Sequence, residues 1–314
     1  MMPVLRALVV YLLLPVTLLL VFVLSWLRWE SSLPRDDWFG ERQGRIDTVQ
    51  AETSPVEYEQ LSESVRLVSD TGLRVSFRVI RKAEPGARVP VLLILGGHRT
   101  GKDAVDLFGD VGDRAIIGMD YPYDGPEKVR GFINTARTIP LARQAILDTV
   151  PAMSLVLDWL MQQEWVDSDR VVVVGASFGV PFAAAAAARE PRISGAILVH
   201  GAADNPLWLE VQDARRIESE ALHYPLSVIL NWLAYGPVFD TSNYVSVLSP
   251  RPIVIVAAKE DERTPAGQAE LLFNSAGEPK RLRYTDGLHI QPNRPDIVAD
   301  LLLIADEELA FLTR

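Results

Sequence analysis

One serine of the sequence lies in a setting that is typical of nucleophilic catalysis. Ser177 is the centre of Gly175-Ala-Ser177-Phe-Gly179, which has the pattern G-x-S-x-G and directly follows four valines at 171–174. The valines predict a buried strand, and the alanine-rich stretch 180–189 predicts a helix packed closely on a sheet. Between a strand and a helix, this pattern holds a serine hydroxyl outward on a tight, strained turn. The sequence therefore predicts that Ser177 is a nucleophile.

A serine hydroxyl needs a neighbouring base to accept its proton, and that base is usually a histidine oriented by a carboxylate. The chain has four histidines, His98, His200, His223 and His289. His289 lies on the loop after the last predicted strand, and this position makes it the preferred base.

The orienting carboxylate is expected on the loop that follows the preceding predicted strand, at 252–258. Asp261 is the preferred residue there, and its neighbours Glu260 and Glu262 remain alternatives. Asp204 is a further alternative because it follows the strand before that one. Its other interpretation is the N-cap of a helix, a position that favours aspartate.

The three motifs occur in the order Ser177, Asp261, His289, which is the chain order of α/β-hydrolase triads. On these motifs, residues 56–314 resemble the α/β-hydrolase superfamily. The segment 167–170, Asp-Ser-Asp-Arg, is similar to its dienelactone hydrolase and prolyl-oligopeptidase-like branches. The resemblance implies an α/β fold with a mostly parallel, eight-stranded-type sheet. The alternation of predicted strands and helices favours the same sheet, with helices on both faces.

The resemblance also implies two backbone N–H donors for the oxyanion of the tetrahedral intermediate. One would be the N–H group of Phe178, directly after the nucleophile, and the other that of Gly97, on the loop after the third strand. The family often has His-Gly where this chain has Leu95-Gly96. The register of the loop is therefore open by one residue, and His98 is the alternative donor.

The same loop offers a competing interpretation as a nucleotide site. Gly96-x-x-x-x-Gly101-Lys102 follows the P-loop pattern, but Asp103 stands where a Ser or Thr should bind magnesium. Asp120, at the end of a nearby strand, is similar to the magnesium-binding aspartate of such enzymes. A carboxylate at Asp103 would repel phosphate, so a P-loop-like nucleotide binder is the weaker hypothesis. A non-catalytic binding module is the other alternative.

Composition narrows the function classes further. With 314 residues and 48% hydrophobic residues, the chain can form one large α/β domain. A formal net charge of −10 argues against nucleic acid as a partner. The absence of cysteine excludes disulfides, thiolate metal sites and cysteine catalysis. No metal or organic cofactor is implied, and the expected partner is a small-molecule ester or acyl substrate.

The amino terminus predicts a membrane anchor. Residues 7–27 carry no charge and are long enough to cross a bilayer as a helix, with Trp26 and Trp29 at one interface. Residues 1–28 are therefore expected to form a single transmembrane anchor, and a cleaved signal peptide is the alternative. Arginines after this segment outnumber Arg6 before it, which favours a cytoplasmic catalytic domain. Short anchors of secreted-side enzymes often run the other way, so the side of the membrane stays open.

The rest of the chain divides into a linker at 29–55 and a catalytic domain at 56–314. Two antiparallel strands, near 65–68 and 73–81, are expected to open this domain. The segment at about 204–250 is too long for a simple crossover and is expected to form a helical cap over the active site. Together these features predict a membrane-anchored serine hydrolase that cleaves a carboxylic ester or a thioester through an acyl-enzyme. A prolyl-oligopeptidase-like peptidase is the alternative.

Overall fold

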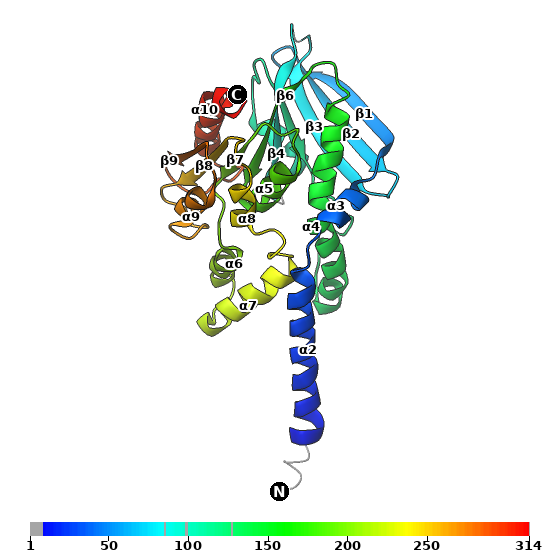
Figure 1. The fold of residues 1–314 in the computed structure, drawn as a ribbon, viewed down its shortest axis with the longest axis vertical. Coiled ribbons are helices and arrows are strands. Elements are labelled where there is room, and N and C mark those ends of the chain that lie inside the picture. Colours follow the sequence, from blue (N-terminus) through cyan, green and yellow to red (C-terminus); the bar gives the residue numbers. More distant parts are fainter. Residues whose placement is uncertain (1–8, 85, 98–99, 127, 314) are drawn as a thin grey trace.

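A single nine-stranded sheet runs through the body of the protein (Figure 1). The computed structural model describes residues 9–84, 86–97, 100–126 and 128–313. The spatial order of the strands is β1-β2-β3-β5-β4-β6-β7-β8-β9. In chain order they are β1 Ile46–Val56, β2 Gln60–Ser69, β3 Arg74–Lys82, β4 Val89–Leu95, β5 Ala115–Met119, β6 Val166–Ala176, β7 Gly195–Val199, β8 Ile253–Ala258 and β9 Lys280–Thr285.

The sheet is mostly parallel, as the sequence predicts. β1, β2 and β3 form an antiparallel meander that joins the remainder through the antiparallel pair β3 and β5. All pairs among β4 to β9 are parallel. Every residue of β4 is buried, and so is every residue of β7, as expected for parallel strands covered on both faces.

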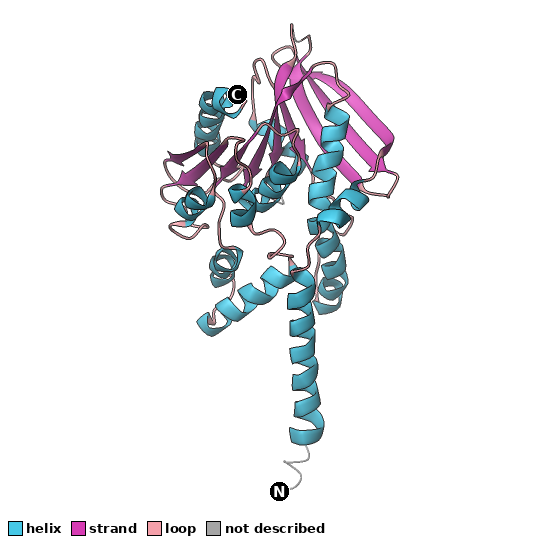
Figure 2. Ribbon diagram, in the orientation of Figure 1, coloured by secondary structure: helices cyan, strands magenta, loops and turns pink. Residues whose placement is uncertain are grey.

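Helices cover both faces of the sheet (Figure 2). One face packs against α3 Asp36–Gln43, α4 Phe132–Leu160, α5 Val180–Arg189, α8 Thr241–Ser246 and α9 Gln268–Ser275. The other face packs against the 3-10 helix η2 Gly101–Leu107 and against α10 Pro295–Leu312. The two faces hold separate hydrophobic cores, and alternate residues of the central strands contribute to each.

The segment expected to be a linker is ordered, which corrects the predicted boundary. Residues 29–55 comprise the end of one helix, all of α3 and most of β1, and β1 pairs with β2 along its whole length. Because of β1, the sheet has nine strands instead of the eight expected. All but the first residue of β1 are exposed. A solvated edge strand lacks the alternation of buried apolar residues that a sequence pattern needs.

The segment at 204–250 contains three helices. α6 Asn205–Ala214 and α7 Glu220–Leu233 pack on each other and lie off the carboxyl edge of the sheet (Figure 1). α8 packs against α5 instead and belongs to the body of the domain. Only α6 and α7 are therefore placed as a cap.

The amino-terminal helix projects from the body (Figure 1). A π-helical turn, η1 Val9–Leu13, leads into α2 Leu14–Ser31, in which only Leu27 and Ser31 are buried. Within the described residues, α2 is the one helix with the length and composition to cross a membrane. Residues 1–8 of the predicted anchor lie outside the described residues.

Candidate active site

The predicted site residues follow parallel strands whose carboxyl ends meet at one edge of the sheet. β4 lies between β5 and β6, so the strand order reverses there, and ligands of open α/β sheets bind at such a switch point. Leu95 at the end of β4 pairs with Gly175 near the end of β6. The glycine-rich loop after β4 and the turn after β6 are therefore neighbours. The loops after β8 and β9 carry Asp261 and His289.

The turn after β6 shows why its two glycines are needed. Ser177 adopts a left-handed backbone conformation with φ of 54°, which aims its side chain out of the turn. A Cβ on Gly179 would lie 1.9 Å from the carbonyl oxygen of Leu95. A Cβ on Gly175 would lie 2.6 Å from the Cβ of Ala183. Glycine at both positions lets the turn fit between β4 and α5.

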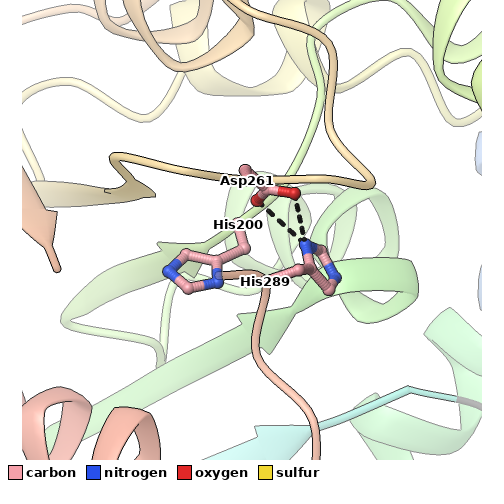
Figure 3. A group of neighbouring side chains, drawn as sticks. All are labelled: His200, Asp261 and His289. Atoms are coloured by element: carbon pink, nitrogen blue, oxygen red, sulfur yellow. Dashed lines mark hydrogen bonds and ion pairs between the residues drawn. The ribbon is translucent and has the colours of Figure 1, made fainter. Parts of the chain in front are cut away.

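The structure brings the predicted serine, histidine and aspartate together. The Oγ atom of Ser177 lies 2.7 Å from Nε2 of His289. On the other side of the ring, Nδ1 lies 2.9 Å from Oδ2 and 3.0 Å from Oδ1 of Asp261 (Figure 3). His289 is 1% exposed, so this chain of hydrogen bonds is shielded from water.

The surroundings of Asp261 keep its carboxylate ionised. Burial alone would raise the pKa of Asp261, but hydrogen bonds from His289 and from the backbone N–H groups of Arg263 and Thr264 outweigh it and lower the pKa. An ionised carboxylate only accepts hydrogen bonds, so Nδ1 of His289 must carry the proton. Nε2 is then the basic nitrogen, and it faces the hydroxyl of Ser177.

The alternative acids have other contacts. Glu262 accepts the backbone N–H of His289 at 2.9 Å and pairs with Arg294 at 3.0 Å, so it supports the loop rather than the ring. Asp204 is the N-cap of α6 and accepts the N–H of Leu207 at 2.8 Å. The side chain of Glu260 is exposed. Among the four candidate carboxylates, Asp261 is the one hydrogen-bonded to the imidazole.

His200 is part of the site, although sequence reasoning gave it no role. It is 1% exposed, and its Nδ1 accepts the backbone N–H of Ile290 at 2.9 Å. Its carbonyl accepts the hydroxyl of Thr264 at 3.1 Å, so it joins the loops that carry the acid and the histidine. Burial, and then the nearby charge of His289 when protonated, lower the pKa of His200 to about 4. The sequence feature that could have indicated a role for His200 is its position directly after β7, at the same edge of the sheet as the site.

The same residues offer one set of atoms that could hold a metal ion. Ligand atoms of His200, Asp261 and His289 all lie within 4.8 Å of one another (Figure 3). The Asp261 carboxylate and Nδ1 of His289 are hydrogen-bonded to each other, and Nδ1 of His200 accepts the N–H of Ile290. A metal would have to break these bonds, so the arrangement fits a hydrogen-bonded site better than a metal centre.

The two residues predicted to supply oxyanion donors line one cavity with Ser177. Gly97 and Phe178 line the same cavity as Ser177 and His289. The hydroxyl of Tyr121 donates to the carbonyl of Gly96 at 2.7 Å, and its ring packs against Phe178 with centroids 5.4 Å apart. Tyr121 therefore joins the two segments that would supply the donors. His98, the alternative donor, lies outside the described residues.

The structure gives the P-loop interpretation little support. Lys102 donates to Asp120 from its backbone N–H at 2.8 Å and from Nζ at 2.7 Å. Asp103 lies 3.4 Å from Arg78. The cation and the aspartate that a nucleotide site would require therefore pair with each other. The 3-10 helix η2 also replaces the α-helix whose amino terminus holds phosphate in such proteins.

A cavity of about 850 Å³ opens at the serine. This volume lies within the range of small-molecule sites, which is about 300–1,000 Å³. Its lining extends from Ser177 and His289 in two directions. One part is formed by the cap and is mixed in polarity, with Trp208, Leu209, Gln212 and Asp213 of α6, Arg215 and Arg216 directly after it, and Leu230 of α7. The other part lies between the sheet and α10 and is mainly apolar, with Leu92, Ile94, Val174, Val199, Leu301 and Ala305.

Comparisons with known proteins agree with this architecture. Residues 147–286 match the model of the prolyl oligopeptidase family. No curated protein sequence matches the chain.

Solved structures share the fold. Acetyl xylan esterase 1 from a Thermoanaerobacterium species superposes with a TM-score of 0.59 at 18% identity, covering 89% of this chain and 95% of that one. An acetyl xylan esterase from a Paenibacillus species gives 0.60 at 17% identity, with coverage of 86% and 93%. A cold-adapted esterase from an Arctic intertidal metagenomic library gives 0.53 at 14% identity, with coverage of 84% and 100%. These neighbours share the α/β-hydrolase fold with this chain, and residues 147–286 are similar to the prolyl oligopeptidase family.

Proposed function

We propose that the protein is a membrane-anchored serine hydrolase that cleaves a carboxylic ester through an acyl-enzyme intermediate. The observation that carries the proposal is the continuous hydrogen-bonded chain from Ser177 through His289 to Asp261. In this series of hydrogen bonds the imidazole of His289 faces the hydroxyl of Ser177, and the ionised carboxylate of Asp261 stabilises the positive charge that the imidazole acquires.

In the first half of the reaction, Oγ of Ser177 attacks the ester carbonyl carbon while Nε2 of His289 accepts the hydroxyl proton. The backbone N–H groups of Phe178 and Gly97 stabilise the oxyanion of the tetrahedral intermediate. As the intermediate collapses, His289 donates that proton to the leaving alkoxide, and the acyl group stays on Ser177. Asp261 holds the ring in the required tautomer throughout.

In the second half, water enters the site and His289 removes its proton as the oxygen attacks the acyl carbon. The second tetrahedral intermediate uses the same N–H donors. Its collapse returns the proton to Ser177 and releases a carboxylic acid. The net reaction is addition of one water across the ester bond. A thioester would follow the same steps with a thiol as the leaving group.

The esterases among the structural neighbours favour an ester, while the family match supports a peptidase as the second candidate. Ester and peptide hydrolysis would use the same serine, histidine and aspartate, so the residues that line the cavity distinguish the two reactions. The largely apolar lining between the sheet and α10 suits an acyl chain better than a peptide backbone, whose polar groups would be left without partners there.

The test is hydrolysis by the purified full chain of nitrophenyl esters of graded chain length and of aminoacyl amides. Ester turnover is expected, and Ser177→Ala should lower it by about 10⁴-fold or more. Ser246→Ala, on α8, is the matched control and should retain full activity, because the Ser246 hydroxyl bonds only locally to the carbonyl of Asn243. Cleavage of the amides alone would make the protein a peptidase. Unchanged ester turnover by Ser177→Ala would refute the proposed nucleophile.

A further inference from the structure

Helix α7 buries polar residues and exposes apolar ones, which is the reverse of what is usual for a helix that faces water. Its two buried residues are Ser227 and Asn231. Leu222, Tyr224 and Leu230 are instead 48%, 63% and 38% exposed. A surface helix of a soluble domain normally buries its apolar side chains and exposes polar ones. Leu222 lies opposite Ser227 and Asn231 on the helix, so it marks an outer face that is built for surroundings other than water.

The carboxyl end of α7 is fixed to the carboxyl end of α2. Arg143 donates to the carbonyls of Trp232 and Leu233, at 3.3 and 2.7 Å, and also pairs with Glu30 of α2. The hydroxyl of Tyr235, directly after α7, donates to Glu30 at 2.9 Å. These contacts fix the carboxyl end of α7 beside the carboxyl end of α2.

If α2 crosses a bilayer, the junction between the carboxyl ends of α2 and α7 lies at the membrane surface. Arg28 and Glu30 are the first charged residues after the apolar stretch, and charged residues mark where a spanning helix leaves the hydrocarbon region. From this junction α7 extends sideways, across the direction of α2 (Figure 1). A helix in that position with apolar side chains exposed would lie in the plane of the membrane interface.

Exposed apolar side chains occur on both α2 and α7, and the two helices are in contact. On α2, Leu18, Leu20, Phe22 and Trp26 are each at least half exposed. Within α7 the acidic and basic residues are Glu220 and His223, both in its first turn. The rest of the helix therefore presents no charge to a bilayer.

The cavity connects this surface with the proposed nucleophile. Leu230, on α7, lines the same cavity as Ser177, and so does Trp208, on α6. Beyond Ser177 the cavity continues as the apolar space between the sheet and α10, which Leu92 and Leu301 both line. Arg215 and Arg216 line the same cavity near the cap, so an apolar chain would rest in the space beside α10 and not along the whole cavity.

We infer that the outer face of α7 docks on the lipid bilayer that α2 enters, and that the substrate is an amphiphilic ester with a long apolar chain drawn from that bilayer. The inference rests on the proposed hydrolase and its anchor, and it adds the class of substrate and the source of it. Bilayer lipid is the preferred occupant of this face because α7 contacts α2 and is bonded to the end at which α2 would leave a bilayer. A second copy of the chain is the competing occupant.

The first experiment compares two substrates of the full-length protein reconstituted in phosphatidylcholine vesicles. One is a short, water-soluble nitrophenyl ester, and the other is a long-chain ester embedded in the vesicles. The variant Leu222→Glu should lower hydrolysis of the embedded ester at least about tenfold and leave the soluble ester unchanged, because charge is unfavourable in the bilayer interface. The matched control is Leu271→Glu, at a position 50% exposed on the body of the domain, where Leu222 is 48% exposed on α7.

The two substrates separate failure of this inference from failure of the proposed function. If the wild-type protein hydrolyses neither ester, the hydrolase proposal fails. If it hydrolyses the soluble ester and the α7 variant acts on both substrates like wild type, the hydrolase stands and the membrane route is wrong. Equal losses in the α7 and control variants would also overturn the route, because the effect would then not be specific to α7.

A second experiment identifies what covers α7, and the absence of native cysteine makes it direct. Single cysteines at Leu222, Val247 and Leu20 are labelled with an environment-sensitive fluorophore, and nitroxide-labelled lipids are then added. Quenching at Leu222 and Leu20 but not at Val247 is expected. Quenching at Leu20 alone, with crosslinking between the Leu222→Cys sites of two copies, would show that a second copy covers this face and would overturn the inference.

Discussion

At the scale of single residues, the proposed chemistry depends on which nitrogen of His289 carries the proton. The Asp261 carboxylate receives that proton's hydrogen bond and two more from the backbone N–H groups of Arg263 and Thr264. These contacts fix the carboxylate as well as the ring. Glu262 and His200 hold the backbone on either side of the His289 ring by accepting the N–H groups of His289 and Ile290.

Asp261→Asn should lower kcat for ester hydrolysis by about 10⁴-fold, because the amide can donate to Nδ1 and favour the wrong tautomer. Asp204→Asn is the matched control. Asparagine is as good an N-cap as aspartate, so the α6 cap and the activity should both be retained. Steady-state kinetics of the two variants checks this. A large loss in Asp204→Asn together with a small one in Asp261→Asn would reverse the assignment of the acid.

His200 predicts how stability depends on pH. Its folded-state pKa of about 4 lies below the ordinary value of 6.5, so between these values the unfolded chain binds a proton that the folded protein does not. The contribution of His200 to the free energy of unfolding is therefore fully present above about pH 6.5 and falls by roughly 3 kcal/mol as the pH drops to 4. Chemical unfolding at several pH values should show a shallower dependence for His200→Gln. The same slope in wild type and variant would contradict the buried, neutral histidine.

At the scale of elements, the site depends on how closely the turn after β6 approaches β4. Gly179 is in contact with the backbone of Leu95 at the end of β4, and the loop after that strand carries Gly97. One side-chain atom at position 179 would push the nucleophile away from the proposed oxyanion donors.

Gly179→Ala should therefore destabilise the fold by about 1–3 kcal/mol or more and reduce activity at least about 100-fold, because a Cβ has no room at 1.9 Å from a carbonyl oxygen. Gly40→Ala is the control, since no atom lies within 4 Å of its added Cβ and alanine favours the helix α3. Thermal unfolding and ester kinetics measure both effects. Equal stability of the two variants would show that the turn can relax without cost.

At the scale of the whole molecule, the sequence predicts features that local patterns encode. Valines followed by G-x-S-x-G indicate the strand and turn around Ser177. The order of the three motifs along the chain predicts that Asp261 and His289 act with this serine. The order of parallel strands then places all three loops at one edge.

Features that depend on distant contacts could not be predicted in the same way. β1 lacks an apolar face, so no pattern separates it from a linker. The contacts of His200 join residues 264, 285 and 290, far from it in the chain. The junction of Glu30, Arg143 and Tyr235 depends likewise on three segments meeting in space.

The most direct test of the central claim is covalent labelling of the full chain with a fluorophosphonate, followed by mass mapping of the adduct and assay of the residual ester hydrolysis. We expect one adduct per chain on Ser177, loss of hydrolysis in proportion to labelling, and no label on Ser177→Ala. An adduct on another residue, or full hydrolysis by a chain completely modified at Ser177, would contradict the account.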